Sequence, residues 1–103
     1  MAVQVLPTID RLPEPLRRYM DGVTQEHLLL IVLKRELYEG DWVAMSTDLH
    51  NRLAGRPYVL RLAGRIEEDL KRIEQLNQLE RHYQVDLADY VQPLQDVSME
   101  SHA

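Results

Sequence analysis

Four arginines in one short segment are the most distinctive group of side chains that could bind a ligand. The pentapeptide RLAGR occurs at residues 52–56 and again at 61–65, and no acidic residue stands between the two copies. Guanidinium groups bind carboxylates and phosphates through paired N–H donors. The segment is therefore a candidate site for an anion or a protein partner, formed by Arg52, Arg56, Arg61 and Arg65.

The same arginines also have a purely structural interpretation, in which they are solvated or paired with Glu39, Asp41 or Asp48. Binding to nucleic acid is opposed by the net charge of −5 and by the acidic run 67–69 that follows the segment directly. Both features repel a phosphate backbone. We expect no nucleic-acid binding, and keep a nucleic-acid-binding regulatory protein as the alternative function.

Residues that could do catalysis do not form a recognisable pattern. His27, His50, His82 and His102 are scattered, and none is spaced for a metal-binding helix face. The chain has no cysteine, and it shows neither a glycine-rich phosphate loop nor a nucleophile elbow. The sequence therefore predicts a protein that is not an enzyme and needs no metal or cofactor.

Length and composition place these side chains on one small globular domain. The chain has 103 residues, of which 45% are hydrophobic and 28% are charged. The longest apolar run, LLLIVL at 28–33, is too short to cross a bilayer. We expect a cytoplasmic protein without membrane contact, with one helical domain at 1–95 and a flexible tail at 96–103.

Two helices are predicted from their apolar spacing and from the residues at their ends. Residues 24–39 begin at a capping Thr24, and their all-round apolar centre is typical of the central helix of a bundle. A short buried strand is the competing interpretation of that centre. Residues 41–54 begin at a capping Asp41 and end before Gly55.

A third and longer helix is predicted over residues 57–83. Pro57 suits its first turn, and an apolar stripe from Leu62 to Tyr83 recurs at helical spacing. On the outer face, Glu67 with Lys71 and Glu68 with Arg72 are spaced for ion pairs. The second RLAGR would then lie inside this helix, where Gly64 favours either close approach of another helix or simple exposure.

The ends of the chain are predicted to add an extended N-terminal arm and a short helix on each side of the three main helices. The fold class is therefore all-α, as a small helical bundle.

The length of the third helix leads to the prediction about partners. It would be about 40 Å long and would extend beyond its two shorter neighbours. Its apolar stripe would then be covered either by residues 1–20 and 86–94 or by a second chain. We expect a homodimer or a heterologous protein partner, with a candidate interface at Gly64, Ile73, Leu76, Leu79 and Tyr83.

The sequence thus favours a non-enzymatic interaction module, or a small regulatory or adaptor protein, that associates with itself through the third helix.

Overall fold

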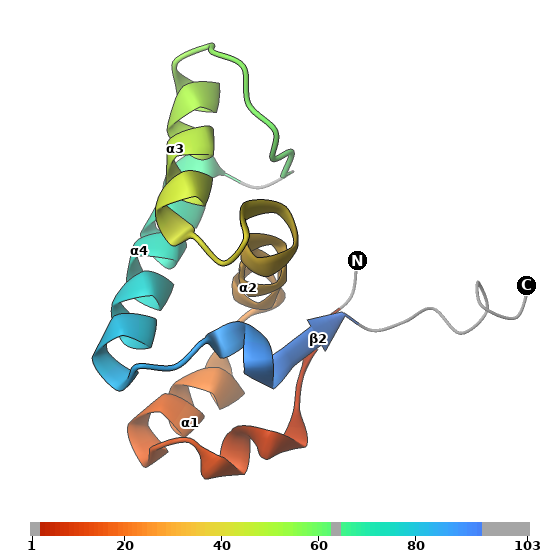
Figure 1. Cartoon of the computed structure of the whole chain (residues 1–103), viewed down its shortest axis with the longest axis vertical. Coiled ribbons are helices and arrows are strands. Elements are labelled where there is room, and N and C mark those ends of the chain that lie inside the picture. The colour runs from red at the N-terminus through yellow and green to blue at the C-terminus, as the bar shows by residue number, and fades with distance from the viewer. Residues whose placement is uncertain (1–2, 63–64, 94–103) are drawn as a thin grey trace, which may run out of the picture.

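One central helix, α2, is surrounded by the other elements of the chain (Figure 1). The structure is a computed structural model that describes residues 3–62 and 65–93. In chain order its elements are β1 (Val3–Val5), the 3-10 helix η1 (Pro7–Arg11), α1 (Glu14–Gly22), α2 (Gln25–Tyr38), α3 (Trp42–Leu53), α4 (Ile66–Tyr83), the 3-10 helix η2 (Leu87–Tyr90) and β2 (Val91–Pro93). The described chain is mostly helical, which confirms the predicted class.

Helix α2 is central because its apolar residues point in every direction. Thr24 caps its first turn by accepting a hydrogen bond from the His27 amide. Leu28, Leu30 and Ile31 are all buried, although they do not share one face. The helix contacts α3, α4 and both strands. The helix predicted at 24–39, and its central position, are therefore confirmed.

Helix α3 also matches the sequence. The Asp41 carboxylate accepts hydrogen bonds from the amides of Val43 and Ala44, at 2.9 and 3.2 Å. This places a negative side chain at the positive end of the helix dipole. Gly55 follows the helix with a φ of 71°, a left-handed conformation that favours glycine.

The two ends of the described chain are joined by a small sheet that the sequence did not predict. β1 and β2 pair antiparallel, with Val3 opposite Pro93 and Val5 opposite Val91. The outer edge of β1 is closed by Gln25, whose side-chain amide exchanges hydrogen bonds with both backbone groups of Val3. The predicted extended arm is thus a strand, and its partner comes from the other end of the chain.

The third helix is shorter than predicted, because α4 begins at Ile66 and not at 57. Residues 56–62 form no helix or strand, so Arg61, Leu62 and Arg65 of the second RLAGR do not lie inside a helix. Arg65 is the N-cap, and three acidic residues occupy the first turn, where the helix dipole favours negative charge. Gly64 lies outside the described residues, so its predicted role there stays a prediction.

The predicted length of the third helix is wrong for the same reason, although α4 is still longer than α2 and α3. Eighteen residues form a helix of about 27 Å, not 40 Å. Ile73 and Leu76 are buried against the chain's own core, and Leu79 and Tyr83 are half-buried against it. The hydroxyl of Tyr19 in α1 also reaches α4, donating to Gln75 at 3.1 Å. The cover of this stripe therefore comes from within the chain.

A buried lysine connects α2 to the C-terminal half of the fold. The Lys34 side chain is 1% exposed, and its ammonium donates to Glu80 at 2.7 Å and to Asp86 at 3.0 Å. The ammonium also lies 4.8 Å from the centre of the Trp42 ring, and the Trp42 indole donates to Glu80 at 2.6 Å. Residues of α2, α3 and α4 and the N-cap residue of η2 thus surround the Lys34 ammonium.

Asp86 completes this cluster at the start of η2. Burial by itself would raise the pKa of Asp86, but hydrogen bonds from Arg35, from the Ala88 amide and from Lys34 outweigh it and lower the pKa to about 2. The carboxylate is therefore ionised across the physiological range, and it caps η2 while it neutralises the lysine.

Breaking this cluster from one side should be costly. Lys34→Met leaves the Glu80 carboxylate buried and unpaired, so the free energy of unfolding should fall by about 3–5 kcal/mol. In the double variant Lys34→Met/Glu80→Gln, the side chain at position 80 is a neutral amide. Its loss of unfolding free energy should therefore be clearly smaller than the sum of the losses in the two single variants. Urea unfolding of the four proteins measures this coupling, and strictly additive losses would contradict it.

Candidate functional site

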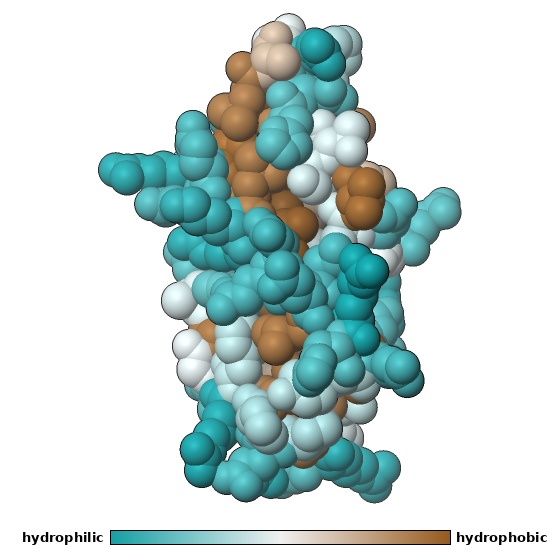
Figure 2. All heavy atoms as spheres, turned by 90° about the vertical axis from the view of Figure 1, so that its left-hand side faces the viewer, coloured by the Kyte–Doolittle hydropathy of each residue, from teal (hydrophilic) through white to brown (hydrophobic). Residues whose placement is uncertain are grey.

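A groove lies between α3 and α4, and both apolar and polar residues line it. Its volume is about 400 Å³. Figure 2 shows an apolar strip running down the upper half of this face, between hydrophilic borders. The groove is lined by Trp42, Val43, Ser46, Thr47, His50, Leu70, Lys71, Ile73, Glu74 and Asn77.

Helical periodicity explains why these residues meet. The α3 residues 43, 46, 47 and 50, and the α4 residues 70, 73, 74 and 77, each follow the spacing of one helix face. Trp42 and Ile73 are buried beneath the groove, whereas Val43 stands at its border with 65% of its surface exposed.

Two oppositely charged residues of α4 also line the groove, three positions apart. Lys71 and Glu74 are both exposed, and neither forms an ion pair within the described part of the chain. The predicted pair of Glu67 with Lys71 is therefore not formed. The predicted pair of Glu68 with Arg72 is present, at 3.8 Å.

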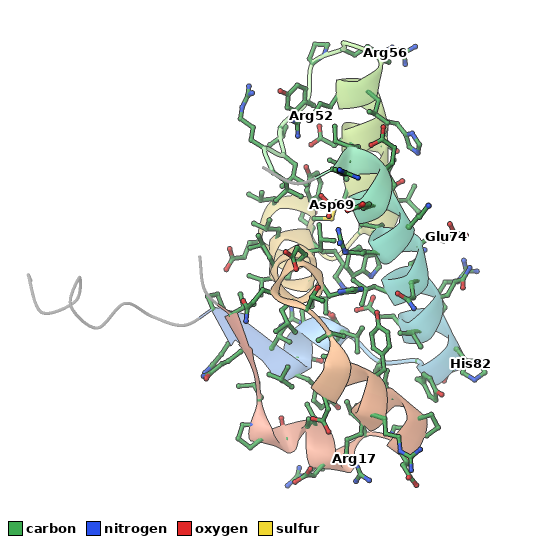
Figure 3. The ribbon with its side chains drawn as sticks, turned by 180° about the vertical axis from the view of Figure 1, so that it is seen from behind. Arg17, Arg52, Arg56, Asp69, Glu74 and His82 are labelled. Carbon is green, nitrogen blue, oxygen red and sulfur yellow. The ribbon has the colours of Figure 1, made fainter. Side chains whose placement is uncertain are left out.

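The described residues of the range 52–65, which we call the arginine segment, lie on a different side of α3 from the groove. Figure 3 shows Arg56 at the far end of the molecule and Arg52 on the side of α3 that faces away from Glu74. Arg52 and Arg61 both approach the ring of Tyr58, at 5.5 and 4.8 Å from its centre. The structure thus brings two of the four arginines together on one aromatic ring.

The other two arginines stay apart from that pair. Arg65 caps α4 and lies 3.6 Å from Glu68, whereas Arg56 is exposed in the loop. The expected pairing of these arginines with Glu39, Asp41 or Asp48 is not seen among the described residues. Arg52 and Arg61 instead donate to the Leu62 carbonyl and the Tyr58 hydroxyl, both at 3.0 Å.

Asp48 holds this segment in place, a role that the sequence did not reveal. Its buried carboxylate accepts hydrogen bonds from the amides of Val59 and Leu60, at 2.7 and 2.6 Å, and from the Tyr38 hydroxyl. Burial alone would raise the pKa of Asp48, but these three donors outweigh it and lower the pKa. The amides of Val59 and Leu60 are thus held by a side chain from α3.

Three of the four histidines lie in the described chain, and each has a different setting. His27 Nδ1 lies 2.7 Å from the capping Thr24 hydroxyl, and burial lowers its pKa. His82 packs edge-on against Tyr83, with 4.7 Å between ring centres. His50 lines the groove together with Ser46 and Thr47 of the same helix. Among these residues no group of three or more potential metal-binding side chains comes together.

Comparisons with protein-family models, with curated proteins and with solved structures found no match. None of the described helices has the length and hydropathy that crossing a bilayer requires.

Removing the Asp48 carboxylate should release the extended segment. Asp48→Ala leaves the Val59 and Leu60 amides and the Tyr38 hydroxyl without their acceptor, so we expect a loss of about 2–3 kcal/mol in unfolding free energy. Urea unfolding measures that loss, and hydrogen exchange at the two amides should become faster. Asp21→Ala, at an exposed aspartate of α1, is the control. Unchanged exchange at Val59 and Leu60 would show that other contacts hold the segment.

Proposed function

We propose that this protein is a cytoplasmic, non-enzymatic interaction module that associates with itself through α4, using the groove that α4 forms with α3. It acts as a small regulatory or adaptor protein. The observation that carries this proposal is the groove itself, which is open, about 400 Å³ in volume and bordered by an exposed valine.

The groove suits a helix as its occupant. Both of its walls are helix faces, and apolar helix faces commonly bind a further helix through residues spaced three and four apart. Val43 and Leu70 offer apolar contacts, while Ser46, Thr47 and Asn77 offer a polar border. A second copy of the chain carries such a helix face on the same surface, since a two-fold axis pairs a surface with itself.

The described interface residues predicted from sequence are buried or half-buried within the single chain, so they contribute less to the proposed interface than the sequence suggested. Ile73 lies at the base of the groove, and Leu76 is buried beneath α4. Charged substitutions at either position would damage the core and could not report on association alone. Val43 is the better probe, because its side chain is exposed in the single chain.

Self-association is tested by comparing two exposed valines. Val43→Glu should weaken dimerisation by about tenfold or more, because a dimer would bury an unpaired carboxylate in the groove. Val59→Glu is the matched control, since Val59 is 69% exposed but lies on the arginine segment. Sedimentation equilibrium over a range of concentrations gives the three dissociation constants. A wild type that stays monomeric at high micromolar concentration would remove the proposal, as would equal effects of the two substitutions.

A second candidate function, regulatory nucleic-acid binding, is favoured by one observation. Arg52, Arg56 and Arg61 form no ion pair among the described residues and keep unused donors. Two features oppose it: the net charge is −5, and two guanidinium groups already cover the Tyr58 ring on which a base could stack.

We therefore expect no sub-micromolar binding to random duplex DNA at physiological ionic strength. Fluorescence anisotropy with a labelled duplex at several salt concentrations measures this. If salt-sensitive binding were found, Arg56→Ala/Arg61→Ala should reduce the slope of log affinity against log salt by about two. That pair of results would replace self-association with the second candidate.

A further inference from the structure

We infer that the second copy lies antiparallel across α4, with the two-fold axis between residues 71 and 74, so that Lys71 of each chain pairs with Glu74 of the other. This inference rests on the proposed self-association and adds its register and its charge contacts. It follows from how the charges of α4 are already used within one chain.

Three charged residues in the first half of α4, Glu68, Asp69 and Arg72, have ion-pair partners in their own chain. Glu68 lies near Arg65 and Arg72, at 3.6 and 3.8 Å, and Asp69 pairs with Arg72 at 2.7 Å. Glu67, Lys71 and Glu74 form no ion pair among the described residues. Lys71 and Glu74 line the groove, and Glu74 accepts a 3.5 Å hydrogen bond from the Gln78 amide. A cation and an anion without ion pairs thus share one open surface.

Their spacing makes this surface complementary to itself. In an antiparallel pair of identical helices, a two-fold axis midway between residues 71 and 74 places each of them opposite the other type. Side chains three apart lie on the same face, so both ion pairs form at once. The same register sets Glu67 opposite Gln78, where the side-chain amide can donate to the carboxylate.

A parallel pairing in register has the opposite consequence. It would place Lys71 against Lys71, Glu74 against Glu74 and Glu67 against Glu67 of the second copy. Like charges placed directly opposite destabilise an interface and are a common means of excluding a wrong partner or orientation. The charge pattern of α4 therefore selects the antiparallel arrangement.

The apolar residues agree with that arrangement. Val43 and Leu70 flank the two charged positions at the groove, from α3 and from α4. An α4 helix of the second copy lying along the groove would cover these side chains in both chains. The apolar contacts then supply affinity, and the reciprocal ion pairs fix register and orientation.

Charge reversal tests this register directly. In a dimer of Lys71→Glu, the new carboxylate of each chain lies opposite Glu74 of the other chain, so two like-charge contacts form. In a dimer of Glu74→Lys, the new ammonium groups lie opposite Lys71 in the same way. Each variant alone should therefore dimerise about ten- to a hundredfold more weakly than wild type. The double variant Lys71→Glu/Glu74→Lys restores opposite charges at both contacts, so its dissociation constant should return to within a few fold of the wild-type value.

A mixture of the two single variants gives a second and independent rescue. In the mixed dimer, the carboxylate introduced at position 71 of one chain meets the ammonium introduced at position 74 of the other. The remaining contact pairs the native Glu74 with the native Lys71. With one variant carrying an affinity tag, mixed dimers should be co-purified in excess over either homodimer. Sedimentation of the mixture should show wild-type-like association.

Arg17→Glu and Asp21→Lys are the matched controls, because they make the same charge changes on α1. Figure 3 shows Arg17 at the end of the molecule opposite the arginine segment, distant from the groove. Circular dichroism and urea unfolding confirm that each variant folds. These controls should leave the dissociation constant unchanged.

The outcomes separate this inference from the proposed function. If wild type dimerises and Val43→Glu prevents it, but the charge reversals have no effect or are not rescued, the register is wrong and the groove interface remains. If both single variants weaken the dimer and the double variant and the mixture restore it, the register is established. A monomeric wild type overturns both.

Discussion

The positive charge of Lys34 can be buried only because residues far apart in the sequence surround it. Glu80 comes from α4, Asp86 from the start of η2 and Trp42 from the first turn of α3, while Lys34 itself belongs to α2. Each group needs the others, since an unpaired charge in this position would cost several kcal/mol. Glu80 also accepts from the Leu87 amide, so the same carboxylate orients the chain as it leaves α4. The C-terminal segment is thereby directed towards β1, where the sheet forms.

Asp48 has a comparable role at the other end of the molecule. By accepting the Val59 and Leu60 amides, it stabilises an extended path where a helix was expected. That path places Arg52, Tyr58 and Arg61 on one side of α3 and leaves the other side of α3 facing the groove. The arginine segment and the groove are therefore separate surfaces. A substitution on one surface does not touch the residues of the other. Matched substitutions on the two surfaces can therefore distinguish their functions.

The groove remains open because the short terminal elements cover other parts of the molecule. β1, β2 and η2 contact α2, and Tyr19 of α1 reaches Gln75 on α4. Val43, Lys71 and Glu74 receive no such cover within the described chain. Apolar contact residues combined with two opposite charges three residues apart are more specific than an apolar patch alone, because the charges distinguish one orientation of a helix from the other.

The sequence by itself determined the all-α class, the position of α2 and α3, and the short helix after Asp86. These depend on local rules: capping by Thr24, Asp41 and Asp86, and apolar residues at helical spacing. It also identified the arginines and the apolar stripe of α4, but not their surroundings. Only the tertiary structure decided where α4 begins, that Ile73 and Leu76 are covered by their own chain, and that Lys71 lacks the ion pair expected with Glu67. The physical reason is that these outcomes depend on distant partners. The buried Asp48 carboxylate accepts the Val59 and Leu60 amides and so holds that segment against α3, and no local pattern around residues 57–65 shows that such a carboxylate will be there.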